Sequence, residues 1–175
     1  MKKGIFLALY YCIAYYLPSS YTHFGGRVFN WFRIFCAKRI FMKCGTITTI
    51  DTHAYFGNGC EVEIGDESGI GAYNHLPNNI KIGKYVMMGP DVYIVGNGEN
   101  HRFDNTDTPM CRQGKTVPIT TIIDDDCWIG ARVVMTAGRH VRKGSIVAAG
   151  AVLTKDFEEY SIVGGNPAKL LKKRK

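Results

Sequence analysis

Between Val62 and Gly96, an aliphatic residue or methionine recurs at every sixth position. An α-helix repeats about every 3.6 residues and a strand about every two, so neither element alone produces this spacing. A solenoid whose coil has three short, flat faces does, because each face then directs one apolar side chain to the axis. The members of this ladder are Ile64, Ile70, Leu76, Ile82, Met88 and Ile94. Glycine or proline follows each of them except the last, as tight corners require.

The period returns after a polar interruption. The second ladder is Ile123, Ile129, Met135, Val141, Val147 and Leu153. The step from Ile94 to Ile123 is not a multiple of six. We therefore expect residues 96–116 to form a loop inserted into the solenoid, rather than a run of weak repeats. Long loops in repeat proteins commonly carry function.

Residues 1–44 lack the repeat and are aromatic, apolar and basic. The apolar run from Ile5 to Leu17 is shorter than the roughly 20 residues that a helix needs to cross a bilayer. The following Pro18 ends a first helix, and a second helix is expected over Gly26 to Met42. Two interpretations stay open. The segment packs on its own domain or another subunit, or it lies as an amphipathic helix on an anionic membrane surface.

Composition limits the partners. The formal net charge of +7 suits nucleic acid, a phosphate-bearing cofactor or an anionic membrane. No zinc-finger, RNP or helix-turn-helix signature is present, so no nucleic-acid partner is expected. The six cysteines form no CxxC pair and no metal or disulfide spacing, which indicates reduced thiols in a cytoplasmic protein. Residues 166–175 are expected to form a basic helix, with Asn166 as N-cap and Pro167 in its first turn.

Three stretches carry a family resemblance: "IGKYVMMGPDVYI", "NHRFDNTDTPMCRQG" and the run from "CWIGARVVM" to "GGNPAKLLKKR". Their combination of W-I-G, A-G-A-V-L-T-K-D and G-N-P-A-K resembles the hexapeptide-repeat acetyltransferases, above all the sugar O-acetyltransferases of surface polysaccharide synthesis. The resemblance implies an all-β solenoid, a left-handed parallel β-helix over residues 45–165. Helices in residues 1–44, the inserted loop 96–116 and a C-terminal helix over 166–175 complete the expected chain. It also implies a homotrimer with active sites between adjacent β-helices.

His101, in the inserted loop, is the candidate general base. A hydroxyl acceptor must lose a proton as it attacks a thioester, and imidazole is well suited to accept it. The family's catalytic histidine lies in this loop; the alternative is an ordinary surface histidine. His75 competes less well, and no closely spaced histidine pair indicates a metal site. Three loop and corner carboxylates are candidates either to orient His101 and bind sugar or to fill turn positions: Asp91, Asp104 and Asp107.

The other site residues follow from the resemblance. Asn74 falls where galactoside-type members place an acceptor-binding asparagine; the alternative is a turn asparagine. Trp128 matches a tryptophan that lines the cleft near the acyl chain. The full set of expected coenzyme A contacts is Trp128, Ala131, Ala149, Thr154, Lys155, Lys169 and Lys172. The alanines suit a slender pantetheine chain and the lysines suit phosphate. The alternatives are tight packing for the alanines and a solvated charged tail for Lys169 and Lys172.

The sequence therefore predicts an acetyl-CoA-dependent O-acetyltransferase that acts on a sugar hydroxyl by direct attack, without a metal. One alternative is an acetyltransferase of serine, a nucleotide-sugar amine or an antibiotic. Another is a β-helix scaffold without catalysis. The expected location is the cytoplasm, at the inner face of the membrane if residues 1–44 contact lipid.

Overall fold

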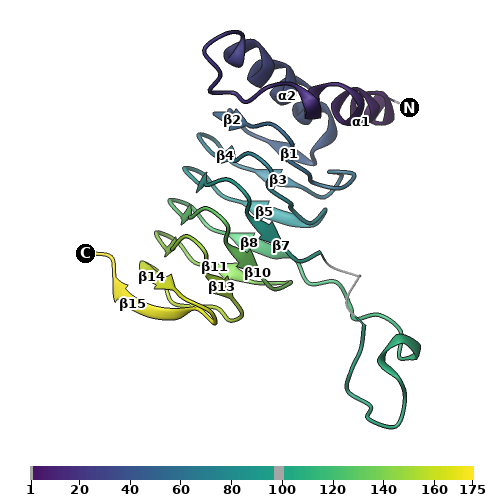
Figure 1. The fold of residues 1–175 in the computed structure, drawn as a ribbon, viewed down its shortest axis with the longest axis vertical. Helices are drawn as coiled ribbons and strands as arrows, with labels where there is room; N and C mark the ends of the chain where they lie inside the picture. Colours follow the sequence, from purple (N-terminus) through teal and green to yellow (C-terminus); the bar gives the residue numbers. More distant parts are fainter. Residues whose placement is uncertain (1, 97–100) are drawn as a thin grey trace.

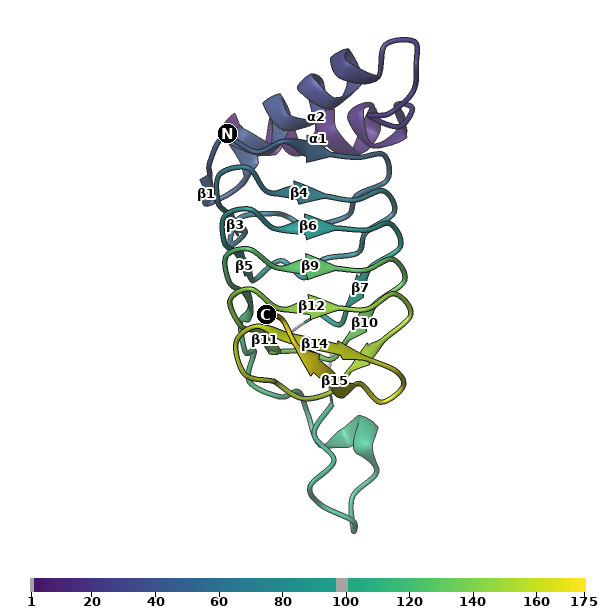
Figure 2. The same cartoon turned by 90° about the vertical axis from the view of Figure 1, so that its left-hand side faces the viewer.

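The computed structural model describes residues 2–96 and 101–175 as a parallel β-helix with helices across one end (Figure 1). The first face holds β1 (Lys43–Cys44), β3 (Glu63–Ile64), β5 (Ile80–Ile82), β8 (Thr121–Ile123) and β11 (His140–Val141). The second holds β2 (Thr49–Ile50), β4 (Gly69–Ile70), β6 (Met87–Met88), β9 (Trp128–Ile129), β12 (Ile146–Val147) and β14 (Ser161–Gly164) (Figure 2). The third holds β7 (Tyr93–Ile94), β10 (Val134–Met135) and β13 (Val152–Leu153).

The two predicted ladders form the core of this solenoid. Ile64 pairs with Ile82, and Met135 with Leu153, so a regular coil takes three hexads. Every ladder side chain is buried except that of Met88, which is half-buried. Each buried aliphatic side chain stabilises the fold by about 1.5–3 kcal/mol, so the ladder is a main source of stability. The predicted solenoid is confirmed.

Two coils depart from the length of three hexads. Ile50 pairs with Ile70, so the first coil is slightly longer than a regular one, and this explains why the period blurs before Val62. Ile82 pairs with Ile123, so a second coil is more than twice the regular length. Residues 97–100 of the predicted loop 96–116 lie outside the described residues. The described part of this insertion contains the short 3₁₀ helix η2 (Met110–Arg112) and projects from the solenoid (Figure 1).

Both predicted N-terminal helices form. They are α1 (Lys2–Cys12) and α2 (Gly26–Ile40), with the 3₁₀ turn η1 (Ala14–Tyr16) between them. We call residues 2–41 the helical cap. Its core is continuous with the first coil, since the Phe56 ring lies 4.5 Å from that of Tyr10 and 4.7 Å from that of Phe41. Within residues 2–96 and 101–175, every helix is too short or too polar to span a bilayer.

The prediction of a C-terminal helix is wrong. Residues Lys169–Lys173 form strand β15, which runs antiparallel to β14. The chain reverses at Gly165, whose φ of +96° lies in the region that favours glycine, and Asn166 with Pro167 completes the turn. The last coil would otherwise expose the edge of β14, and pairing with β15 supplies partners for its backbone groups. The need to cover this edge therefore outweighs the local helix signals of the tail.

Candidate active site

Trp128 lies on the second face of the solenoid. Strand β9 places it in register between Met87 and Ile146 of the neighbouring coils. Alternation along the strand buries Ile129 and turns Trp128 outward, where 51% of its surface is exposed. An indole this exposed in a regular strand is available to contact a ligand.

Ala131 and Ala149 lie one coil apart at the corner between the second and third faces. The Gly150 amide donates a hydrogen bond of 2.8 Å to the Ala131 carbonyl, which fixes this stacking. A Cβ on Gly130 would lie 2.5 Å from the Ala149 nitrogen, so the coils approach closely here. The corner that follows Trp128 is therefore lined by small residues and backbone, as the prediction requires.

Thr154 and Lys155 follow β13 at the next corner and are exposed. Lys155 contributes to an open depression of about 490 Å³ whose lining also includes Arg142, Leu170 and Lys173. Lys169 and Lys172 are exposed on β15, which forms the neighbouring edge. The structure thus places cations around the end of the solenoid, although Asp156 and Glu158 also line the depression and Glu158 pairs with Lys173. It adds Arg142, which sequence reasoning missed because its closeness to Lys155 depends on the coil geometry.

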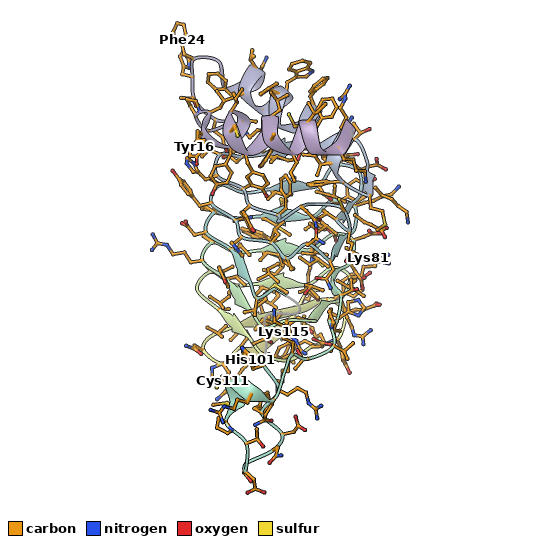
Figure 3. The ribbon with its side chains drawn as sticks, turned by 90° about the vertical axis from the view of Figure 1, so that its right-hand side faces the viewer. Tyr16, Phe24, Lys81, His101, Cys111 and Lys115 are labelled. Atoms are coloured by element: carbon orange, nitrogen blue, oxygen red, sulfur yellow. The ribbon has the colours of Figure 1, made fainter. Side chains whose placement is uncertain are left out.

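His101 is exposed at the base of the inserted loop, where its backbone pairs with Lys115 in an isolated antiparallel bridge (Figure 3). Asp104 lies beyond it and accepts two hydrogen bonds from Arg102, of 3.0 and 2.6 Å. The hydrogen bonding of Arg102 lowers the pKa of Asp104. Its carboxylate is therefore engaged by Arg102 rather than aimed at His101. Asp91 lies elsewhere, 3.8 Å from Arg132 at a corner of the solenoid.

One chain does not bring His101 and Trp128 together. The second face, which holds Trp128 on β9, faces the viewer in Figure 2, whereas His101 is seen from the opposite side in Figure 3. The third face separates them, because the loop leaves the solenoid after β7 of that face. Both residues enter one site only if a second copy supplies one of them.

The predicted acceptor contact of Asn74 does not fit its position. Its side chain is fully buried inside the coil, where Oδ1 accepts a 2.9 Å hydrogen bond from the Val92 amide. Its Nδ2 faces the Met88 sulfur at 3.8 Å. Asn74 therefore joins two successive coils from within, and a sugar in solvent does not reach it.

The third face carries an aromatic column that sequence reasoning missed. The rings of Tyr55, His75 and Tyr93 stack with centroid distances of 4.5 and 4.6 Å. Beside them, at the loop base, lies a depression of about 340 Å³ whose lining includes Glu61 and Asn78. The spacing of the coils could have revealed this column in the sequence, since each of its aromatic residues follows the previous one by a single coil.

Cys127 precedes Trp128 but does not offer a nucleophile. Its side chain is buried, and burial raises the pKa of the thiol to about 11. The thiol is neutral at physiological pH and therefore a weak nucleophile. No group of three or more His, Cys, Asp or Glu side chains within residues 2–96 and 101–175 is arranged to hold a metal ion.

Comparison with known proteins finds a hexapeptide-repeat match and similar acetyltransferases. Residues 120–155 match the model for the hexapeptide repeat of succinyl-transferase. A probable macrolide acetyltransferase of Lysinibacillus sphaericus is 36% identical over 115 residues, 58% of this chain and 64% of that protein. A chloramphenicol acetyltransferase of Escherichia coli is 43% identical over 106 residues, 53% and 50% of the two chains. The chain thus matches less than two thirds of the length of either relative.

Solved structures agree with the fold. A hexapeptide-repeat acetyltransferase of Vibrio cholerae superposes with a TM-score of 0.66 at 25% identity, covering 82% of this chain and 80% of that one. A maltose O-acetyltransferase of Clostridium difficile 630 gives 0.72 at 20% identity, covering 99% and 87%. The chain is a parallel β-helix built from hexapeptide repeats. This fold is the left-handed parallel β-helix of the hexapeptide-repeat acetyltransferases to which the chain is similar.

Proposed function

We propose that the chain is an acetyl-CoA-dependent O-acetyltransferase that transfers an acetyl group to a sugar hydroxyl. The observation that carries the proposal is that one chain presents both an exposed histidine on the inserted loop and, on another face, an exposed tryptophan beside a corner of small residues. The similar proteins include a probable macrolide acetyltransferase, a chloramphenicol acetyltransferase and a maltose O-acetyltransferase, which supports acetyl transfer by this chain. A scaffold without catalysis would not need either side chain exposed.

In the proposed reaction, His101 accepts the proton of the acceptor hydroxyl as its oxygen attacks the thioester carbonyl. A new C–O bond forms, the carbonyl becomes a tetrahedral oxyanion, and backbone amides near the cleft stabilise it. The C–S bond then breaks, and His101 returns the proton to the coenzyme A sulfur. The attack is direct, and the neutral thiol of Cys127 is consistent with a reaction that forms no acyl-enzyme.

The donor would lie along the corner between the second and third faces. Ala131 and Ala149 leave room for pantetheine, and Trp128 would cover the acetyl end. Thr154 and Lys155 would meet the nucleotide end, with Lys169 and Lys172 from β15 supplying further positive charge to its phosphates. All of these residues except Ala131, which is half-buried, are exposed in the single chain.

For the acceptor we propose the depression at the loop base in place of Asn74. Its lining includes one glutamate, two asparagines and two tyrosines, and the polar groups of such residues bind sugar hydroxyls. The side-chain oxygen of Asn78 is buried there without a hydrogen-bond partner among the described residues. The macrolide and chloramphenicol relatives support an antibiotic hydroxyl as the second candidate. The polar lining favours the sugar.

The assembly and location belong to the same proposal. A homotrimer with its sites between adjacent chains would bring the loop of one copy to the second face of the next. Such a heterologous interface closes into a ring when three copies meet. The enzyme would act in the cytoplasm, at the inner face of the membrane where residues 1–44 contact lipid.

The test measures binding and turnover separately. Calorimetric titration with acetyl-CoA should show saturable binding that Lys155→Ala weakens. His101→Ala should lose turnover of sugar acceptors by at least about a hundredfold and keep coenzyme A affinity. His23→Ala, an exposed histidine of the helical cap, is the matched control and should change neither. Unchanged turnover in His101→Ala would overturn the general base, and no acetyl-CoA binding would overturn the acetyltransferase.

A further inference from the structure

The net charge of the chain is concentrated in residues 1–50. They contain seven Lys and Arg residues and no Asp or Glu, so they carry the whole formal charge of +7. Residues 51–175 hold equal numbers of basic and acidic side chains and are neutral overall. The basic part forms the helical cap and the start of the first coil, at one end of the molecule (Figure 1). The excess positive charge of the chain therefore lies in this part, whereas the basic tail is balanced by the acidic residues of the coils.

Helix α2 has a second apolar face directed away from the solenoid. Its inner face buries Arg33, Cys36, Ala37 and Ile40. At about 100° per residue, Trp31 and Phe35 fall on the opposite side with Val28 beside them. Val28 and Trp31 are 63% and 61% exposed. Phe24, just before the helix, is 89% exposed and projects at the end of the molecule (Figure 3).

Cations border this apolar stripe. By the same helical geometry, Arg27 and Lys38 lie along one side of the stripe and Arg39 along the other, and all three are exposed. The Arg39 guanidinium stacks 3.6 Å from the centre of the Phe35 ring, so its charge is held at the edge of the stripe. An apolar stripe with aromatic rings and a basic border is the pattern of helices that lie in a membrane interface.

We propose that the outer face of the helical cap docks reversibly on an anionic lipid bilayer. Phe24, Val28 and Trp31 would enter the interface, and Arg27, Lys38 and Arg39 would meet the lipid headgroups. The positive charge of the cap favours an anionic bilayer over a second copy of this chain as its partner. A second copy of the cap would bring like charges together without any acidic partner, whereas an anionic bilayer complements them. The basic tail competes poorly, because Lys173 and Arg174 are already paired with Glu158 and Asp126.

Docking by the cap also sets the height of the proposed active site above the membrane. Three strand spacings separate β2 from β9, about 14 Å, and the helical layer adds about 10 Å. This corollary rests on the proposed function. It selects an acceptor that extends from the bilayer, such as a lipid-linked glycan, over a hydroxyl at the lipid headgroup.

Vesicle co-sedimentation tests the docking itself and needs no acceptor. The full chain should bind vesicles of about 30% phosphatidylglycerol in phosphatidylcholine, bind pure phosphatidylcholine far less, and dissociate as salt rises. Phe24→Ser with Trp31→Ser, or Arg27→Ser with Lys38→Ser, should each lower the partition coefficient at least about tenfold. The control Tyr85→Ser with Lys143→Ser alters an exposed ring and cation on the solenoid and should leave binding unchanged.

The two tryptophans report the orientation. With brominated lipids, Trp31 in a Trp128→Phe variant should be quenched, whereas Trp128 in a Trp31→Phe variant should not be. Equal binding by wild type and the cap variants would overturn the proposal, as would quenching of Trp128 alone. The proposal would also be overturned if the wild type did not bind vesicles but formed a dimer in light scattering that the Phe24 and Trp31 variant did not form. None of these outcomes depends on acetyl transfer, so docking and the proposed reaction can fail separately.

Discussion

Arg33 fastens the helical cap to the first coil. Its fully buried guanidinium donates to the carbonyls of Ile50, Leu17 and Pro18 at 2.7, 3.0 and 3.0 Å, and lies 3.7 Å from Asp51. Desolvation lowers its pKa, while the Asp51 charge opposes that effect. The sequence does not distinguish Arg33 from the other cations of α2, because periodicity alone does not show which polar residue will find buried partners.

Replacing Arg33 should destabilise the fold strongly. Arg33→Met keeps the length of the side chain but removes one donor from each of the three buried carbonyls and the cation beside the Asp51 carboxylate. We expect a loss of about 3–5 kcal/mol in the free energy of unfolding, measured by urea denaturation. Arg27→Met, on the exposed side of the same helix, should cost less than about 0.5 kcal/mol. Equal effects of the two substitutions would contradict the anchoring role.

At the scale of the coil, small residues after the strands of the second face let successive turns approach. Gly130→Ala would place a methyl group 2.5 Å from the Ala149 backbone nitrogen, so the backbone itself must move. We expect a loss of about 3 kcal/mol, at the upper end of overpacking costs. Gly150→Ala is the matched control, because its Cβ would meet open space. Its φ of +70° alone should cost about 1 kcal/mol in the same thermal or urea unfolding measurement.

The elements differ in how far local pattern determines them. The ladder from Ile64 to Leu153 was predictable, because each hexad repeats the same requirement for one buried apolar side chain. The longer first coil was not predictable, since its additional residues interrupt the six-residue period by which the other coils are recognised. The tail was misassigned because Asn166 and Pro167 are local helix signals, while the unpaired edge of β14 is a property of the assembled solenoid.

For the whole molecule, the sequence supplies the members of the proposed site but not their arrangement. His101 and Trp128 come from motifs, and nothing in either motif shows that the solenoid separates them (Figures 2 and 3). The predicted acceptor contact of Asn74 is wrong for a related reason. Its motif does not reveal whether the side chain points inward, and the structure buries it against Val92. The aromatic column with Tyr55, His75 and Tyr93 becomes visible only when coils of unequal length are aligned.

The separation of His101 and Trp128 leads to a test of where the site forms. If each proposed site takes His101 from one copy and Trp128 from its neighbour, His101→Ala and Trp128→Ala trimers should each be inactive. Mixed trimers, refolded from equal amounts of the two variants, should then recover about a quarter of the wild-type sites, because random assembly places two intact surfaces together at that frequency. Acetyl transfer by the refolded mixture is the measurement, with each variant refolded alone as the control. A site built within one chain would carry a defect in every copy, so the mixture would stay inactive and the intersubunit site would be ruled out.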